Sequence, residues 1–399
     1  MTTPDATARR TLVACAALAV GALTLTACSG DAKADGKSGG SDDARIVISA
    51  KNGSVGASIN STGVKVSDGK LTGVKMTESA TGADVPGAVA GDGKSWKPKK
   101  RLERGTEYRI AATAEGESGK TAAAKSTFTT VSTDNSFIGT YTPDGGAKVG
   151  VGMPVSFTFD KAITDKKAVQ SHIEVTSSSG QKVVGHWFGS QRLDFRPKEY
   201  WKAGSEVTTK VDLDGVEGAN GVYGVQDKTV TFTVGRSQVS TVDVDTQTMT
   251  VVRDGRTVKT VPISSGSTDN STYNGQMVIA EKFRQTRMNG STVGYGGEYD
   301  IADVPNAMRL TTSGTFIHGN YWYDRGNPPF GKQGTSHGCI GLADAQGAGS
   351  DTSAKWFFDN SLVGDVVTVK NSPDKTVSPD NGLNGWNMAW SAWTAGSAL

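Results

Sequence analysis

Two short neighbouring motifs hold the one cysteine of the folded part, Cys339, and two of the four histidines, His318 and His337. Cys339 lies in the run Thr335–Gly341, and His318 follows an apolar pair that is typical of a strand end. A thiolate is a strong nucleophile, and a nearby imidazole lowers the pKa of the thiol and returns a proton to the leaving amine. We therefore expect Cys339 to be the nucleophile and His318 its base, in acyl transfer through a thioester.

The residues beside this pair have expected supporting roles. The carbonyl of Gly319 is placed to hold the imidazole N–H and so fix its tautomer. Gly338 allows the backbone to approach a substrate closely, and the N–H groups around Gly338 and Cys339 are candidates for an oxyanion site. Ser336 and His337 are expected to shape that site. His337 is the weaker alternative base, because it is too near Cys339 in sequence for a strand pairing to place it.

The elements that carry these residues are predicted to be mainly β. The chain has 399 residues with 51 Gly and only 36% hydrophobic residues, and stretches such as Val155–Phe159 alternate apolar and polar side chains. Segments 45–131 and 136–235 share a layout of turn and closing strand, which indicates duplicated immunoglobulin-like sandwiches without the inter-sheet disulfide. The predicted boundaries are a signal peptide over 1–27, a lipid-anchored linker over 28–44, sandwiches over 45–131 and 132–236, a catalytic domain over 237–370 and a C-terminal extension over 371–399.

The N-terminal segment has the features of a signal peptide for export. Arg9 and Arg10 precede a short apolar run, and the tetrapeptide Leu25–Cys28 resembles the lipobox of bacterial lipoproteins. Diacylglyceryl modification of Cys28 would anchor the chain to the outer face of the membrane, because two acyl chains suffice for stable binding. An ordinary cleaved signal and a twin-arginine route remain alternatives.

The motifs around Cys339 and His318 resemble those of a known enzyme family. The block Ser336–Cys339, preceded by His318 and Gly319, is similar to the signature of L,D-transpeptidases with the YkuD-type catalytic domain, over about residues 238–399. The two β domains and the lipobox resemble the mycobacterial-type arrangement. The resemblance implies Cys339 as nucleophile, His318 as base and the Gly319 carbonyl as its orienter.

The same resemblance implies a substrate-binding set and one departure. Tyr299 matches a lid tyrosine and Trp322 an aromatic residue at the mouth of the site, although either could serve packing alone. Gly341 stands where many relatives carry Asn, which leaves the contribution of that amide open.

The implied reaction takes place on peptidoglycan. Cys339 would attack the third residue of a tetrapeptide stem, release D-alanine and pass the acyl group to the side-chain amine of a second stem, with no metal or organic cofactor. Carbapenem-type β-lactams would acylate the same thiol. Water or a protein amine are alternative final acceptors.

Two other classes of function compete with this hypothesis. One is a non-enzymatic wall-binding lipoprotein, and the other is a zinc site built from His318, His337 and Cys339. His172 and His186 lack a second ligand at metal spacing and are expected to be surface or strand residues. The balance of 42 basic and 40 acidic residues gives no sign of nucleic-acid binding.

Three tryptophans, Trp386, Trp390 and Trp393, recur at helical spacing near the end of the sequence. They predict one face of a short helix that packs the extension on the body, with glycan stacking as the alternative.

Overall fold

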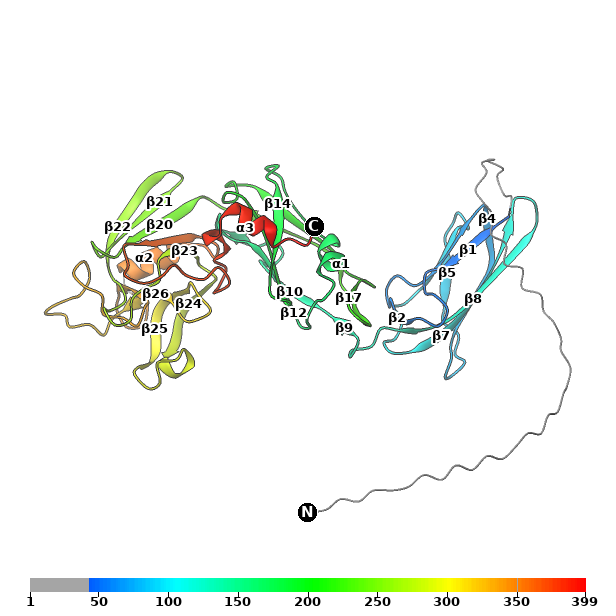
Figure 1. The fold of residues 1–399 in the computed structure, drawn as a ribbon, viewed down its shortest axis with the longest axis horizontal. Helices are drawn as coiled ribbons and strands as arrows, with labels where there is room; N and C mark the ends of the chain where they lie inside the picture. The colour runs from blue at the N-terminus through cyan, green and yellow to red at the C-terminus, as the bar shows by residue number, and fades with distance from the viewer. Residues whose placement is uncertain (1–42, 350) are drawn as a thin grey trace, which may run out of the picture. The chain divides into compact units, whose positions relative to one another are not determined.

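The computed structural model describes residues 43–349 and 351–399, and these are mainly β, as expected (Figure 1). The signal peptide, Cys28 and residues 28–42 of the linker lie outside the described residues. Within the described ranges, no helix is long and apolar enough to cross a membrane.

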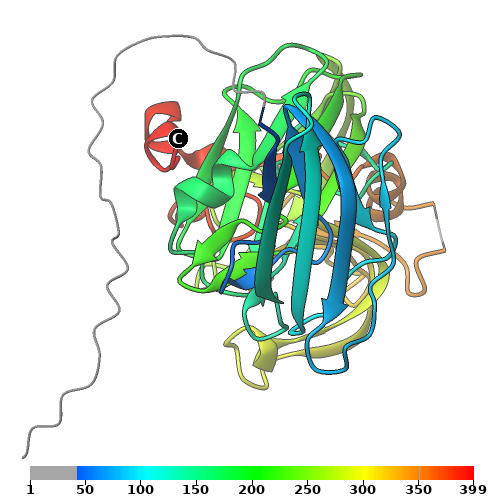
Figure 2. The same ribbon diagram turned by 90° about the vertical axis from the view of Figure 1, so that its right-hand side faces the viewer.

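The first sandwich consists of two four-stranded sheets, in the orders β1-β3-β6-β5 and β2-β8-β7-β4. The long strands β4, β7 and β8 lie side by side in the second of these sheets (Figure 2). Trp96, Ile110 and Phe128 fill the space between the sheets, because alternate residues of each strand point inward. The strands are β1 (Arg45–Ile48), β2 (Val55–Ala57), β3 (Val64–Ser67), β4 (Gly69–Glu78), β5 (Gly87–Val89), β6 (Ser95–Pro98), β7 (Glu107–Gly116) and β8 (Thr121–Thr130).

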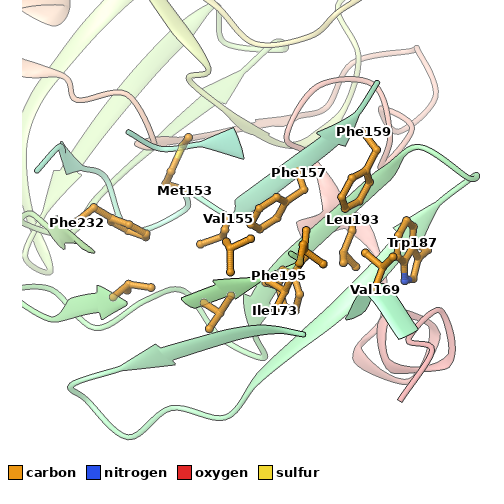
Figure 3. Close-up of a cluster of buried hydrophobic side chains, with 14 of the residues drawn as sticks. Met153, Val155, Phe157, Phe159, Val169, Ile173, Trp187, Leu193, Phe195 and Phe232 are labelled. Atoms are coloured by element: carbon orange, nitrogen blue, oxygen red, sulfur yellow. The ribbon is translucent and has the colours of Figure 1, made fainter. Parts of the chain in front are cut away.

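The second sandwich pairs the sheets β10-β12-β15-β14 and β11-β19-β16-β13, with a small sheet β17-β18-β9 at one end. Its core is aromatic, with Phe157, Phe159 and Trp187 lying together (Figure 3). The elements are β9 (Ser136–Phe137), β10 (Gly139–Thr142), β11 (Lys148–Val149), β12 (Val155–Phe159), α1 (Lys166–Ser171), β13 (Ile173–Ser177), β14 (Val183–Phe188), β15 (Arg192–Pro197), β16 (Glu206–Asp212), β17 (Glu217–Ala219), β18 (Val222–Gly224) and β19 (Asp227–Val234).

The remaining strands form a nine-stranded mixed sheet in the order β23-β28-β20-β21-β22-β27-β26-β25-β24. Two of its pairs are parallel, β20 with β28 and β26 with β27. The elements are β20 (Gln238–Asp243), β21 (Thr248–Arg253), β22 (Arg256–Ser264), β23 (Gly275–Val278), β24 (Glu281–Asn289), η1 (Gly290–Thr292), β25 (Asp300–Arg309), β26 (Phe316–Asn320), β27 (Ile340–Ala343), α2 (Ser353–Asn360), β28 (Val366–Lys370), η2 (Gly385–Asn387) and α3 (Trp390–Ala395).

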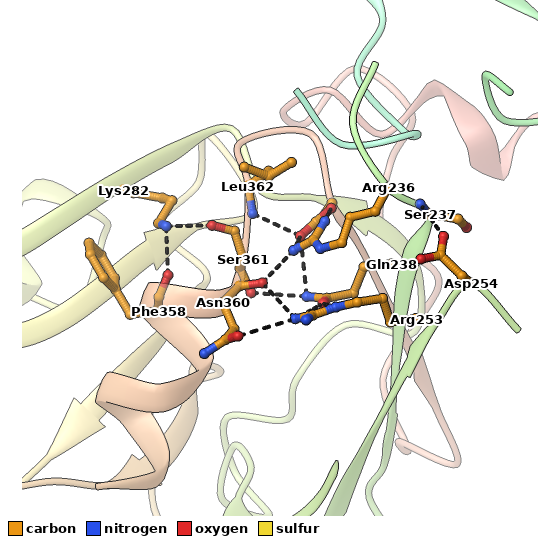
Figure 4. Close-up of polar contacts among 11 residues, drawn as sticks. Arg236, Ser237, Gln238, Arg253, Asp254, Lys282, Phe358, Asn360, Ser361 and Leu362 are labelled. Carbon is orange, nitrogen blue, oxygen red and sulfur yellow. Dashed lines mark hydrogen bonds and ion pairs between the residues drawn. The ribbon is translucent and has the colours of Figure 1, made fainter. Parts of the chain in front are cut away.

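A buried ion pair ties the start of this domain to the loop after α2 (Figure 4). Both guanidinium nitrogens of Arg236 donate to Asp365, at 2.8 and 2.9 Å, and Gln238 and the Leu362 N–H donate to the same carboxylate. Burial raises the pKa of Asp365, although Arg236 opposes this shift. The fully satisfied network fixes where β20 enters the sheet.

The C-terminal extension is not the single helix that the tryptophan spacing predicts. Trp386 lies in the short turn η2, Trp390 and Trp393 lie in α3, and the residues between them are extended. Asn387 explains the break, because its side-chain amide bonds both the N–H and the carbonyl of Gln276 on the edge strand β23. The side chain of Asn387 thus holds the end of η2 against the edge of the sheet, and the α-helix begins only at Trp390.

The extension packs on the second sandwich through an aromatic cluster around Arg196. The guanidinium of Arg196 lies 4.6, 5.3 and 4.3 Å from the ring centroids of Trp386, Trp390 and Trp393. Burial lowers the pKa of Arg196 to about 10. His186, the strand residue on β14, is buried against Trp393, with its Nδ1 2.8 Å from the Trp393 carbonyl oxygen.

Candidate active site

The parallel pair β26 and β27 brings the predicted nucleophile and base to one cavity. His318 lies opposite Gly341 in the register, and Cys339 directly precedes β27. Side chains alternate along β26, so His318 lies on the face of Phe316, while Ile317 lies in the core on the other side. His318 and Cys339 both line a cavity of about 160 Å³.

His318 is held in the tautomer that a general base needs. Its Nδ1 lies 2.9 Å from the carbonyl oxygen of Gly319, so Nδ1 carries the proton and Nε2 has the free lone pair. Burial lowers the pKa of His318, against opposing effects of the Gly319 carbonyl and the Asp344 carboxylate. The imidazole is therefore neutral near pH 7.

Cys339 is a neutral thiol in this site. Burial raises its pKa to about 11, and its Sγ lies 3.6 Å from the carbonyl oxygen of Gly314. The expectation that His318 lowers the pKa of the resting thiol is wrong, because a buried neutral imidazole supplies no positive charge to stabilise a thiolate. Removal of the thiol proton must therefore accompany attack on the substrate.

The rest of the motif shapes the loop that carries Cys339. The Ser336 hydroxyl donates to the Cys339 carbonyl oxygen at 2.6 Å. Gly338 adopts a φ of 100°, which a side chain would strain. His337 also lines the cavity, and its Nε2 lies 2.8 Å from the carboxylate of Glu298. That contact gives His337 a role in holding the segment over the site, and leaves His318 as the base candidate.

The two predicted aromatic residues both line the cavity. Trp322 stacks on His318 with ring centroids 5.6 Å apart, and it is 41% exposed, which places it at the mouth. Tyr299 lines the same cavity and packs on His337. Burial, then the nearby Cys339, raises the pKa of Tyr299 to about 12, so its hydroxyl stays protonated. Gly341 also lines the cavity.

Three polar residues around the site escaped the sequence analysis. Asn320 lines the cavity two residues after His318, and strand alternation could have identified it. The Glu298 carboxylate contacts the imidazole of His337. The Asp344 carboxylate lies beside Gly319 and accepts a hydrogen bond from the side-chain amide of Asn306 at 2.8 Å. No short-range pattern marks these last two, because their partners come from distant segments. Within residues 43–349 and 351–399, no group of three His, Cys, Asp or Glu side chains is placed to hold a metal ion.

A thiol directly before β27 and an imidazole on the adjacent parallel strand β26, in a domain that follows two β-sandwiches, are the arrangement expected of an L,D-transpeptidase catalytic domain. The family model for that catalytic domain matches residues 237–369, and the model for a bacterial Ig domain matches residues 55–217.

The relatives carry the identification further. L,D-transpeptidase 2 of Mycobacterium tuberculosis (strain CDC 1551 / Oshkosh) is 31% identical over 361 residues, which is 89% of this chain and 85% of the relative. L,D-transpeptidase 5 of M. tuberculosis (strain ATCC 25618 / H37Rv) is 31% identical over 346 residues, 84% of this chain and 73% of the relative. A solved L,D-transpeptidase in complex with imipenem is 28% identical and covers 58% of this chain and 97% of its own, with a TM-score of 0.48. The identity to L,D-transpeptidase 2 over 85% of its length shows that the chain belongs to the L,D-transpeptidase family.

Proposed function

We propose that this L,D-transpeptidase crosslinks the third residues of two peptidoglycan stem peptides through a thioester on Cys339. One observation carries the proposal: the Cys339 thiol and the His318 imidazole, with its Nε2 free, line the same cavity. That geometry supports covalent acyl transfer with proton relay, as nucleophile and base pairs do elsewhere. No cofactor takes part in the proposed steps.

The first half-reaction forms the acyl-enzyme. The Cys339 Sγ bonds to the carbonyl carbon of the third residue while its proton passes to Nε2 of His318. The C–N bond to the terminal D-alanine then breaks, and His318 returns the proton to the departing amine. The neutral starting states of both groups fit this order, because the base takes the proton during the attack.

The second half-reaction consumes the thioester. The neutral side-chain amine of a second stem attacks the thioester carbonyl and gives a proton to His318. The C–S bond breaks, and the proton returns to the Cys339 sulfur. The N–H groups of Gly338 and Cys339 are proposed to stabilise the oxyanion in both halves, and the φ of 100° at Gly338 fixes the course of that backbone.

The cavity walls fit a peptide donor. Trp322 and Tyr299 flank the cavity and offer apolar and hydroxyl contacts for the stem. We propose that both contact the donor, and that carbapenem-type β-lactams acylate Cys339 because their strained amide reaches the same thiol.

We also propose where in the cell the protein is located. The N-terminal sequence supports export and attachment through a lipidated Cys28, with the protein at the outer face of the membrane and within the cell wall. In this arrangement the sandwiches act as spacers between the anchor and the catalytic domain.

Mass spectrometry of products from purified stem tetrapeptides tests the proposal. The wild-type chain is expected to release D-alanine and yield a crosslinked dimer, and a carbapenem is expected to add once, at Cys339. Cys339→Ser is expected to abolish both, because a hydroxyl is far less acidic than a thiol. His318→Ala should slow acylation by roughly a hundredfold to ten-thousandfold.

Other outcomes separate the alternatives. A trimmed tripeptide without dimer would identify water as the acceptor and a carboxypeptidase as the activity. A folded wild-type chain that remains unmodified at Cys339 after long carbapenem exposure would refute the catalytic assignment and favour a wall-binding module.

A further inference from the structure

The active-site cavity is lined by one side-chain amide, that of Asn320, whose N–H groups have no acceptor in the described part of the chain. Asn320 is only 8% exposed, and its side-chain oxygen accepts the N–H of Trp322 at 3.2 Å. Its Nδ2 donates to no group among the described residues, although Asn320 lines the cavity together with Cys339. Nδ2 is not among the fully buried polar atoms without a partner, so it can be reached from the cavity, where an oxygen of a bound ligand can accept its hydrogen bond.

Two neighbouring serine hydroxyl groups are already engaged. The Ser264 hydroxyl donates to the Gln333 carbonyl oxygen at 2.9 Å, and the Ser336 hydroxyl donates to the Cys339 carbonyl oxygen. No lysine or arginine lines the cavity as the structure describes it. The Asn320 amide is therefore a neutral donor available for an oxygen of a bound molecule.

The Asn320 amide lies beside the part of the cavity that a side chain at position 341 would occupy. His318 pairs with Gly341 across the two parallel strands, and Asn320 follows His318 on the same face. A Cβ added at Gly341 would lie 3.7 Å from the Cβ of Asn320 and 3.8 Å from its Nδ2. The Asn320 side chain thus lies in ordinary contact with the space that a side chain at position 341 would enter.

We propose that Asn320 is a substrate-binding residue whose Nδ2 donates a hydrogen bond to an oxygen of the donor stem peptide. Gly341 has no side chain, and Asn320 supplies an amide to the same part of the cavity from the adjacent strand. The acceptor is an oxygen close to the scissile bond, either a main-chain carbonyl or the terminal carboxylate of the leaving D-amino acid. This inference rests on the proposed function.

The test compares Asn320→Ala, Asn320→Asp and the double change Asn320→Ala with Gly341→Asn in the full chain. Asp keeps an oxygen for the Trp322 N–H but lacks the amide hydrogens, so it isolates the donor. Asn327→Ala is the matched control, because Asn327 is exposed and lies outside the cavity lining. The readouts are kcat/KM for D-alanine release from a tetrapeptide, the rate of Cys339 alkylation by iodoacetamide, and thermal melting as a check on folding.

Both single changes at Asn320 are expected to lower kcat/KM roughly tenfold, the effect of one lost hydrogen bond. Alkylation of Cys339 should stay within about twofold of wild type, because the thiol and His318 are untouched. Gly341→Asn should restore most of the loss in the double variant, since a Cβ at position 341 meets only ordinary contacts of 3.5 Å or more and the shortened side chain at position 320 leaves room for the new amide. A donor with an amidated C-terminus locates the acceptor: an undiminished loss identifies a main-chain carbonyl, and a reduced loss identifies the carboxylate.

Unchanged kcat/KM in folded Asn320→Asp would overturn the inference while wild-type turnover upheld the proposed function. An equal fall in alkylation and turnover would also overturn it, because Asn320 would then act by positioning His318 or Trp322. A wild-type chain without turnover would instead refute the proposed function itself.

Discussion

Raising the pH from 6 to 11 should reveal that Cys339 starts its reaction as a neutral thiol. The pKa of His318 is lowered from 6.5 and that of Cys339 is raised to about 11, both mainly by burial. Between these two limits neither group changes its protonation state. The carbapenem acylation rate should therefore stay level between about pH 7 and pH 10. It should fall at lower pH as His318 gains a proton and loses its ability to act as a base.

The size of the effect follows from the thiolate fraction. At pH 8 a thiol with a pKa of about 11 is roughly one part in a thousand ionised, whereas an unperturbed thiol with a pKa of 9.0 is roughly one part in ten. Iodoacetamide reacts with the thiolate, so alkylation of Cys339 at pH 8 should be roughly a hundredfold slower in the folded chain than in urea.

Peptide-level mass spectrometry measures this rate in the full chain, because it separates Cys339 from Cys15 and Cys28. His318→Ala provides the control: without the base, carbapenem acylation should follow the thiolate fraction and rise steadily toward pH 11. Half-maximal alkylation of folded wild type at or below pH 8 would refute the reasoning and show a preformed thiolate.

Three further predictions test other parts of the molecule. Trp393→Ala should lower the free energy of unfolding by about 3–5 kcal/mol in urea titrations, because the ring is fully buried, and Trp390→Ala, at a partly exposed ring, should have a smaller effect. Gly319→Ala should slow carbapenem acylation up to roughly a hundredfold and lower the melting temperature, since the new Cβ would lie 2.0 Å from the buried Asp344 carboxylate and shift the carbonyl that holds the base. An unchanged acylation rate would contradict that role of the carbonyl. Cys28→Ala should move the protein from the membrane fraction to the soluble fraction, and an unchanged distribution on fractionation would reject lipid attachment.

Much of the architecture could be predicted from the sequence because period-two patterns are local. Alternation in Val155–Phe159 correctly indicated a strand whose aromatic side chains fill a sandwich core. Phe316 and Ile317 likewise indicated the strand that carries His318. Gly319 could be predicted as the orienter, since the contact joins neighbouring residues.

Contacts between distant segments could not be predicted in the same way. Glu298 reaches His337 only because the chain between β24 and β25 folds over the motif loop. The high pKa of Cys339 results from burial by several segments, whereas the sequence showed only a histidine motif upstream. The tryptophan spacing suggested one helix because it carried no information about Asn387, whose amide pairs with the edge of β23.

The packing of the C-terminal extension on the second sandwich affects the order in which parts of the chain fold during synthesis. Gln170 bonds the Ser397 hydroxyl and the Ala398 N–H, and the Trp187 N–H donates to the carbonyl oxygen of Gly396. These contacts join residues that are about 200 positions apart, so the ribosome must complete the whole nine-stranded domain before the flank of the second sandwich is covered. Until then Trp187 and Arg196 lack their contacts with the extension. The uncovered flank of the nascent chain can therefore bind chaperones or misassemble. A purification tag placed directly after Leu399 would therefore hinder the same late step.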